Sequence, residues 1–196
     1  MTRIGHLYQI RTGLIGLVFL MLVACVNNPK IHTGTKNWQP LAAGTSFVLT
    51  GKMAFSDGDQ GGSGQLEWVQ KQDSLQVTLK APLSKRSWQL TEQSDYSMIR
   101  QDDGQTSYAD NTDELVDAQL GWDVPWQALR QWVRGEHTAN GSRSTDEQGD
   151  VMINDQGWQI VYTRFKATPD GQSYPSRITA RNGSHSIKLV IKSWQW

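Results

Sequence analysis

The chain has 196 residues and carries 19 basic and 19 acidic side chains, so its formal net charge at pH 7 is zero. This balance does not favour binding to nucleic acid or to an anionic membrane surface, because both attract an excess of positive charge. The length fits one domain with a sizeable core. A single cysteine excludes an intrachain disulfide, so the stability of the domain must come from that core.

The first 24 residues are typical of a bacterial secretory signal. Arg3 and Arg11 lie in a basic segment, and an apolar run over residues 13–24 follows it. A helix needs about 20 apolar residues to cross a hydrocarbon core, and this run is shorter. We therefore interpret residues 1–24 as a targeting signal that is removed. Its removal takes away two basic and no acidic side chains, which leaves a slightly acidic chain with all nine tryptophans.

The signal ends in Leu-Val-Ala-Cys at residues 22–25, which resembles the bacterial lipobox. In that motif the cysteine is lipidated and becomes the first residue of the mature protein. The alternative is an incidental or buried thiol. That alternative fits less well, because Cys25 is the one cysteine of the chain and ends a signal of the right length. We expect an S-diacylglycerol and an N-acyl group on Cys25, and no other cofactor.

Residues 25–44 are predicted to form a lipidated, flexible tether, because they are polar, contain Pro and Gly and show no apolar period. Within them we expect a short helical turn over residues 39–43. Trp38 is the first residue expected to dock on the folded body. The folded domain is predicted over residues 45–196.

Alternation of apolar and polar residues predicts β-strands through most of that domain. In residues 46–56, Phe47, Leu49, Met53 and Phe55 share one strand face. The pattern returns over residues 64–68, 75–81, 88–90, 96–98 and 106–108, with a hairpin turn at residues 103–104. The glycine-rich residues 58–64 lack the Lys-Ser/Thr ending of a phosphate loop, and we interpret them as a flexible turn.

The alternation stops in the polar stretch around residues 140–141. It resumes over residues 158–162, 177–180 and 187–191. The Asn-Gly pair at residues 182–183 is the strongest short hairpin signal in the chain. These signals predict a mainly antiparallel β protein.

Two helices are predicted between these two groups of strands. Asn111 or Thr112 caps the first helix, acidic residues occupy its first turn, and Gly121 ends it. The second helix begins at Pro125 and ends at Gly135. The apolar stripe of each helix needs a surface to cover, so both helices are expected to lie across the sheet.

The stripe of the second helix contains Trp126, Leu129, Trp132 and Val133. Such a stripe belongs either to a packed core or to a ligand pocket. Helical spacing alone favours the core.

Catalytic and metal-binding patterns are absent from the sequence. None of the histidines, His6, His32, His137 and His185, lies next to a plausible nucleophile or a carboxylate cluster. Paired-cysteine and H-E-x-x-H metal spacings do not occur. Ser63 is not in a G-x-S-x-G elbow, since residue 65 is Gln. No catalytic residue and no metal ligand is predicted, and the protein is not expected to be an enzyme.

Three stretches together resemble the outer-membrane lipoprotein receptor family LolB. The first is the lipobox that ends at Cys25. The second is residues 79–84 (LKAPLS), which are similar to the family pattern L-x-N-P-L-G. The third is residues 120–125 (LGWDVP) followed by residues 129–135 (LRQWVRG). Their order and spacing match over essentially the whole chain after the signal. Ala81 and Ser84 replace the Asn and Gly usual beside the Pro-Leu pair.

The resemblance implies a half-open antiparallel β-barrel with short helices over an apolar cavity. It implies a monomer, lipid-anchored on the periplasmic face of the outer membrane, that accepts lipoproteins from the periplasmic carrier LolA. Such a protein binds their acyl chains and inserts them into outer-membrane phospholipid without nucleotide. The cavity is then expected to be lined by members of one apolar set: Phe47, Leu49, Phe55, Trp68, Val77, Leu79, Trp88, Trp126, Leu129 and Trp132.

The loop that contains Pro82 and Leu83 is implied to enter the membrane. Strand alternation ends at Ala81, Pro82 cannot donate to a β-ladder, and the three residues after Leu83 are polar. From the residues alone, Leu83 either stands exposed at the tip of the loop or folds back under it. The resemblance implies exposure.

Two other functions stay open at this point. A structural lipoprotein would bind a barrel-assembly or cell-wall partner through an aromatic surface. A lipid hydrolase is disfavoured, because the sequence lacks a nucleophile constellation. Binding of bis-ANS that lipoprotein displaces would distinguish a cavity protein from a structural one.

Overall fold

The computed structural model describes residues 38–82, 86–147, 149–167 and 172–196, which belong to one compact unit. Eleven strands and two helices form within these residues. They are, in chain order, β1 (Phe47–Ser56), β2 (Gly61–Gln70), β3 (Leu75–Lys80), β4 (Ser87–Glu92), β5 (Ser97–Gln101), β6 (Thr106–Ala109), α1 (Thr112–Leu120), α2 (Trp126–Arg134), β7 (Ser142–Thr145), β8 (Val151–Asp155), β9 (Trp158–Ala167), β10 (Ser173–Asn182) and β11 (His185–Gln195).

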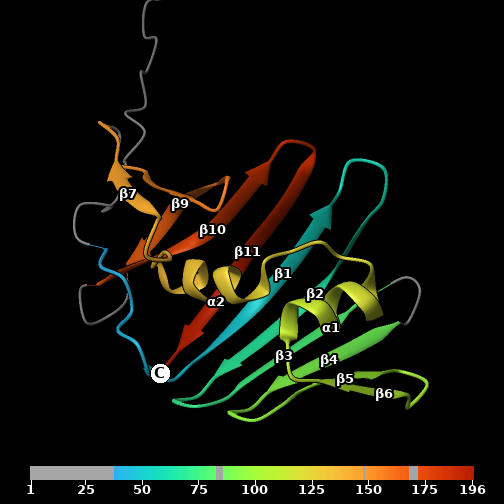
Figure 1. The fold of residues 1–196 in the computed structure, drawn as a ribbon. Helices are drawn as coiled ribbons and strands as arrows, with labels where there is room; N and C mark the ends of the chain where they lie inside the picture. Colours follow the sequence, from blue (N-terminus) through green and yellow to red (C-terminus); the bar gives the residue numbers. More distant parts are fainter. Residues whose placement is uncertain (1–37, 83–85, 148, 168–171) are drawn as a thin grey trace, which may run out of the picture. The chain divides into compact units, whose positions relative to one another are not determined.

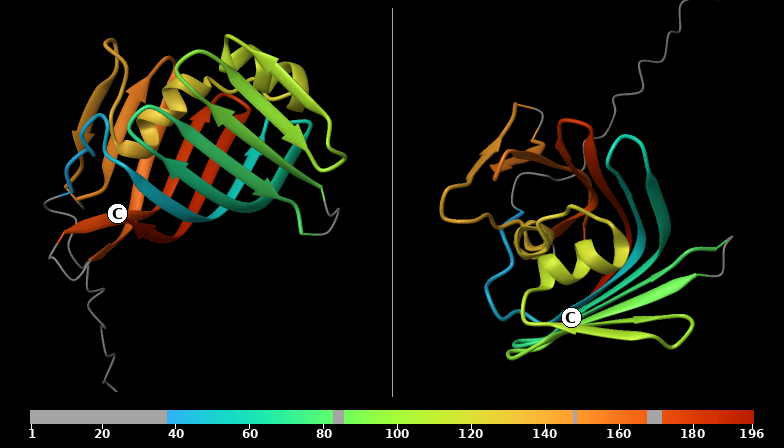
Figure 2. Two further views of the ribbon diagram at one scale, coloured as in Figure 1. Left: turned by 90° about the horizontal axis from the view of Figure 1, so that it is seen from below. Right: turned by 45° about the vertical axis from the view of Figure 1, so that its right-hand side comes forward.

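All the strands belong to one antiparallel sheet with the order β6-β5-β4-β3-β2-β1-β11-β10-β9-β8-β7. Neighbouring strands follow one another in the chain except at the centre, where β1 pairs with β11. The sheet ends at β6 on one side and at β7 on the other, so it is open (Figure 1). Figure 2 shows it curving around both helices. The predicted fold class, a half-open antiparallel barrel with two short helices, is confirmed.

A bulge lies in the central ladder, where the register between β1 and β11 shifts between Thr50 and Gly51. A Cβ atom on Gly51 would lie 2.2 Å from the carbonyl oxygen of Val190, so this close approach requires glycine. The hydroxyl groups of Thr50 and Ser193 hydrogen-bond across the ladder at 2.6 Å. Because a bulge bends its strand and increases the local twist, this one contributes to the curvature of the sheet.

Helix α1 begins and ends where the sequence predicts. The side chain of Asn111 accepts hydrogen bonds from the amides of Asp113 (2.9 Å) and Glu114 (3.3 Å), so Asn111, and not Thr112, is the N-cap. Gly121 ends the helix in the left-handed conformation, with φ of 66°.

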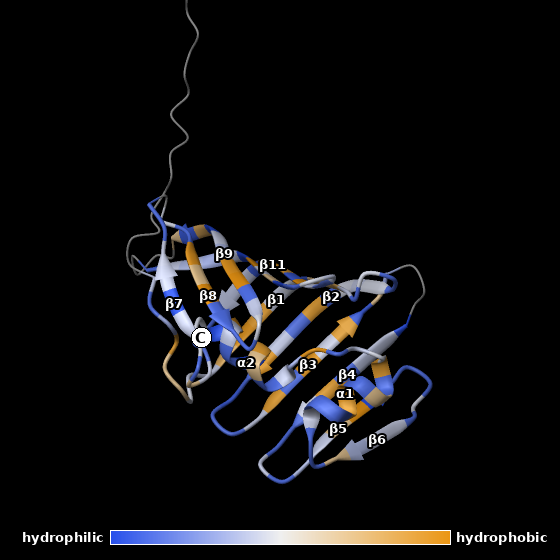
Figure 3. Ribbon diagram, turned by 45° about the horizontal axis from the view of Figure 1, so that its top comes forward, coloured by the Kyte–Doolittle hydropathy of each residue, from blue (hydrophilic) through white to orange (hydrophobic). Residues whose placement is uncertain are grey.

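Helix α2 begins at Trp126, one residue after the predicted start, with Pro125 at its N-cap position, and it ends as predicted, with Gly135 in the left-handed conformation at its C-cap. The predicted stripe of Trp126, Leu129, Trp132 and Val133 is buried. Both helices lie on the concave side of the sheet (Figures 1 and 2). Figure 3 shows apolar residues alternating with polar ones along the strands, as expected when one face of a sheet is covered.

Strands β7 and β8 correct the sequence interpretation, which assigned no strand between residues 140 and 158. Strand β7 is short, and its four residues, Ser142–Thr145, are polar, so they carry no apolar alternation. Strand β8 buries Val151, Ile153 and Asp155, and the charged Asp155 breaks the apolar pattern.

The turn between β1 and β2 is shorter than predicted. Residues 61–64 belong to β2 and pair with β1, so the predicted flexible turn over residues 58–64 is wrong in that half. The carboxylate of Asp57 accepts hydrogen bonds from the amides of Gln60 (2.7 Å) and Asp59 (2.9 Å), which lower the pKa of Asp57 and form the turn.

The segment before β1 packs on the domain from Trp38 onward. Trp38 is 5% exposed and contacts the rings of Tyr162 and Phe165, as the expected docking of this residue requires. The guanidinium of Arg143 lies 5.0 Å from the centre of the Trp38 ring. The helical turn expected over residues 39–43 is wrong: the amide of Thr45 bonds to the carbonyl of Ala42 in a β-turn instead. The predicted signal and Cys25 lie outside the described residues.

Candidate functional site

The apolar residues predicted to line a cavity come together in one interior between the concave face of the sheet and α2. They come from β1, β2, β3, β4 and α2. Phe55 and Trp88 are partly buried and pack against the others. The remaining members are buried in the same cluster: Phe47, Leu49, Trp68, Val77, Leu79, Trp126, Leu129 and Trp132.

A pair of tryptophans links the helix to the centre of this interior. Trp126 of α2 stacks on Trp68 of β2, with ring centres 5.7 Å apart and planes inclined by 20°. Both side chains are fully buried. Neither indole Nε1 has a hydrogen-bond acceptor within the described parts of the chain.

The third tryptophan of the interior, Trp132, is held by polar partners. Its indole N–H donates to Oδ2 of Asp155 on β8 at 2.8 Å. The hydroxyl of Tyr162 on β9 donates to the carbonyl oxygen of Trp132 at 2.7 Å. Burial raises the pKa of the Tyr162 hydroxyl well above its ordinary value, so the hydroxyl keeps its proton and remains a donor.

Asp155 is a buried carboxylate that sequence reasoning missed. Besides Trp132, it accepts hydrogen bonds from the amide of Thr138, at 2.9 Å, and from the Thr138 hydroxyl. Burial alone would raise the pKa of Asp155, but the hydrogen bonds from Thr138 and Trp132, with the nearby His137, lower it below its ordinary value. Asp155 therefore stays charged at neutral pH and ties the end of α2 to β8.

A second polar cluster ties the other side of α2 to the sheet. Arg130 forms an ion pair with Glu92 at the end of β4 and donates to the amide oxygen of Gln70 on β2 at 3.3 Å. The hydroxyl of Thr112 donates to Glu92 at 3.3 Å, and it shares a hydrogen bond of 2.5 Å with Ser97. Polar contacts thus hold α2 on both sides, while its middle faces apolar side chains.

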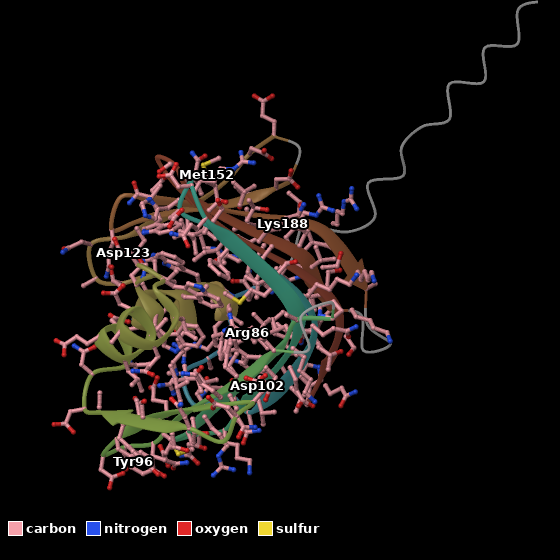
Figure 4. All side chains as sticks on the ribbon, turned by 90° about the vertical axis from the view of Figure 1, so that its right-hand side faces the viewer. Arg86, Tyr96, Asp102, Asp123, Met152 and Lys188 are labelled. Carbon is pink, nitrogen blue, oxygen red and sulfur yellow. The ribbon has the colours of Figure 1, made fainter. Side chains whose placement is uncertain are left out.

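Trp122, which sequence reasoning did not assign to the interior, covers one end of it. It lies in the connection between α1 and α2, is 8% exposed, and packs on Phe55 and edge-on against Trp88, 5.1 Å away. Trp122 also borders a surface depression of about 680 Å³ between the helices and two turns of the sheet. Acidic side chains, including Asp113, Asp117 and Asp123, line this depression, and Figure 4 shows Asp123 on the helix side of the domain.

The predicted membrane-insertion loop connects β3 to β4. The amide of Ala81 bonds to the carbonyl oxygen of Arg86 at 2.8 Å, which brings the ends of the connection together. Pro82 is exposed. Leu83 lies outside the described residues, so its exposure stays a prediction.

Within the described residues, no group of three His, Cys, Asp or Glu side chains could hold a metal ion. In the same residues, none of the helices is long and apolar enough to cross a membrane.

An open, curved antiparallel sheet with two short helices on its concave side defines the LolA-like class of folds. A solved structure of a LolA superfamily protein from Nitrosomonas europaea matches this fold with a TM-score of 0.50 and 11% identity, over 79% of this chain and 87% of that one. A family model described as outer membrane lipoprotein LolB matches residues 45–194, and the chain therefore belongs to this family.

Relatives along most of the chain agree with this assignment. The outer-membrane lipoprotein LolB of Alkalilimnicola ehrlichii is 30% identical over 188 residues, which cover 91% of this chain and 94% of that protein. The protein of the same name from Stutzerimonas stutzeri is 34% identical over 153 residues, which cover 76% and 73%. The resemblance seen in the sequence is confirmed.

Proposed function

We propose that this chain is an outer-membrane lipoprotein that accepts other lipoproteins from a LolA-type periplasmic carrier and inserts them into the outer membrane. Its membership of the LolB family supports a role in outer-membrane lipoprotein localisation. The observation that carries the finer proposal is the convergence of apolar side chains from four strands and α2 on one interior. The acyl chains of the client lipoprotein bind there.

The physical need for such an interior follows from the acyl chains themselves. Exposing a CH₂ group to water costs about 0.8 kcal/mol, so several long chains make an unshielded lipoprotein unfavourable in water by tens of kcal/mol. Each transfer proceeds without nucleotide if the receiving site binds the chains more favourably than the previous one. The protein acts as a monomeric receptor and not as an enzyme.

Entry of an acyl chain requires a movement of α2. Trp68 and Trp126 are stacked and fully buried, so a guest between the helix and the sheet must separate them. The separation breaks no strand pairing, because α2 is held by side-chain contacts such as those of Arg130 and Trp132 and by a backbone hydrogen bond from Leu41, which lies before β1, to Arg134. The bound state is therefore a rearrangement of helix contacts within an intact sheet.

Transfer of a labelled lipoprotein from a LolA-type carrier tests the proposal. The carrier is loaded with fluorescent lipoprotein and mixed with the chain, and the label is followed by co-purification. We expect the label to move to the chain and then into added liposomes. Retention of the label on the carrier, with the chain folded, would contradict the proposal.

The expected lipid anchor is tested by replacing its cysteine. Val26 follows Cys25, and not the Asp that resembles an inner-membrane retention signal, so sorting to the outer membrane is expected. A Cys25→Ala chain should remain at the inner membrane as an uncleaved precursor. Its recovery with outer membranes after a high-salt wash would contradict lipidation at this position.

A second candidate function is supported by an aromatic cluster at the end of β11, of which one member is exposed. Trp196 is 58% exposed, stacks on Trp194 with ring centres 6.0 Å apart, and lies 4.8 Å from Tyr174. A structural lipoprotein would use such a cluster to hold a barrel-assembly or cell-wall partner. Trp196→Ser should leave lipoprotein transfer unchanged if the receptor function is right. It should abolish partner capture if the second function is right.

A further inference from the structure

We infer that the indole N–H groups of Trp68 and Trp126 bind ester carbonyl oxygens of the guest's diacylglycerol group. This inference rests on the proposed function and names the polar contact made inside an interior that is otherwise apolar. The ligand chemistry is a fatty-acyl ester, which accepts hydrogen bonds and has none to donate.

The two indole N–H groups lack the hydrogen-bond acceptors that a packed protein core normally provides. Buried polar groups in folded proteins are nearly always hydrogen-bonded, and an unpaired buried donor is destabilising. Trp68 and Trp126 are both fully buried, yet neither Nε1 has an acceptor in the described residues. Two such donors lie on stacked rings 5.7 Å apart. The two donors therefore belong to the same region of the interior.

Trp132 shows that this fold can provide a buried indole N–H group with a hydrogen-bond acceptor. It lies in the same helix as Trp126, is equally buried, and donates to Asp155 at 2.8 Å. Trp68 and Trp126 thus lack a partner although Trp132, on the same helix as Trp126, has one. Among the described residues, the buried indole of Trp38, which packs against Tyr162 and Phe165, also has no acceptor.

A carbonyl oxygen is better suited to this region than water. A buried water needs about two to four hydrogen-bond partners, including acceptors for its own protons. Tryptophan offers only a donor, and Leu49 and Val77, which flank Trp68 in the β-sheet register, offer apolar side chains. An ester carbonyl needs donors alone, and the methylenes attached to it match the apolar walls.

The test compares two synthetic cysteine lipopeptides that differ only at the carbonyl groups. One carries two ester-linked palmitoyl chains on its glyceryl group, and the other carries hexadecyl chains in ether linkage. The full chain is placed in nanodiscs of ether-linked phosphatidylcholine, so that the only other esters are those of its own expected Cys25 lipid, which are the same in both samples. Benzophenone on the peptide end cross-links bound lipopeptide to the protein. The mole fraction of lipopeptide in the nanodisc at half-maximal cross-linking measures the apparent affinity.

We expect the wild-type chain to bind the ester lipopeptide about fivefold more tightly than the ether lipopeptide for each hydrogen bond gained. Trp68→Phe and Trp126→Phe keep an aromatic ring but remove the donor, and each should reduce this preference. Trp194→Phe is the matched control, because the Trp194 indole donates to the carbonyl oxygen of Pro175 at 3.1 Å and is not among the predicted cavity residues, so it should leave the preference unchanged. An equal affinity of the wild-type chain for both lipopeptides, or a full preference in both Phe variants, would overturn the inference.

A second measurement needs no variant. In the ¹⁵N-tryptophan-labelled chain, binding of the ester lipopeptide should move the indole proton resonances of Trp68 and Trp126 downfield, and the ether lipopeptide should not. Equal shifts with both would count against the hydrogen bonds. Binding of neither lipopeptide would defeat the proposed function as well, whereas equal binding of both would defeat this inference alone.

Discussion

Replacing Asp155 by Ala should destabilise the domain by about 2 to 5 kcal/mol, because it leaves buried donors without an acceptor. The substitution removes the acceptor of the Trp132 indole at 2.8 Å and of the Thr138 amide at 2.9 Å. A buried donor that loses its partner costs about 1 to 3 kcal/mol, which applies in full to the indole, and the half-buried amide and hydroxyl of Thr138 lose the same acceptor and add the rest. The carboxylate is only 3% exposed, so water cannot readily replace it.

The assay is urea unfolding followed by tryptophan fluorescence, on the purified wild-type and variant proteins. Asp123→Ala is the control, because Asp123 is an exposed carboxylate in a loop, and its loss should change the free energy of unfolding by less than about 0.5 kcal/mol. A double-mutant cycle isolates the indole bond: Trp132→Phe should cost about 1 kcal/mol less in the Asp155→Ala background than in the wild type. Strict additivity of the two substitutions would refute the pairing of Trp132 with Asp155.

The lowered pKa of Asp155 adds a dependence on pH. Because the folded state holds this carboxyl in its charged form, the unfolded state binds more protons as the pH falls below about 5. The stability that Asp155 contributes is present above the unfolded pKa and is lost as the pH falls through the lowered folded pKa. The unfolding free energy of Asp155→Asn should therefore depend less on pH between about 5 and 3 than that of the wild type. Parallel curves for the two proteins would contradict the pKa shift.

Three further substitutions test other parts of the domain. Gly51→Ala should destabilise it by about 1 to 3 kcal/mol in urea unfolding, since the added Cβ meets the backbone of Val190, and wild-type stability would rule out this close contact. Trp126→Ala should lower the free energy of unfolding by less than the roughly 3 to 5 kcal/mol typical of a core tryptophan, and it should strongly reduce acyl-chain binding. If the variant is mostly unfolded and its remaining folded fraction accepts acyl chains normally, Trp126 belongs to the packed core. Leu83→Glu should leave acceptance from the carrier intact and sharply reduce transfer into liposomes, and equal transfer by both proteins would show that delivery does not need this side chain.

The elements that the sequence predicted well are those specified by neighbouring residues. The ends of α1 follow from a capping side chain at Asn111 and a glycine at residue 121, and both signals lie within the helix's own segment. The strand residues of the apolar interior were predicted from the alternation of apolar and polar residues, because every second side chain of a strand lies on the same face. Local chemistry is sufficient for both.

The elements that were missed depend on residues far apart in the chain. The polar strand β7 has no apolar period, and it is held by pairing with β8 and by the contact of Arg143 with Trp38, 105 residues away. Asp155 and Glu92 are buried carboxylates whose partners, Trp132 and Arg130, lie 23 and 38 residues away. Trp122 belongs to an irregular loop, where periodicity gives no indication of burial.

The pairing of β1 with β11 determines when the sheet can be completed during synthesis. Thr50 and Ser193, which form a hydrogen bond across this central ladder, are 143 residues apart. One edge of β1 therefore stays unpaired until β11 has been synthesised. Until then the chain can assemble only two separate half-sheets, β1 to β6 and β7 to β10, with an unpaired edge at the centre. The central ladder of the sheet therefore forms only after the carboxy-terminal strand has been synthesised.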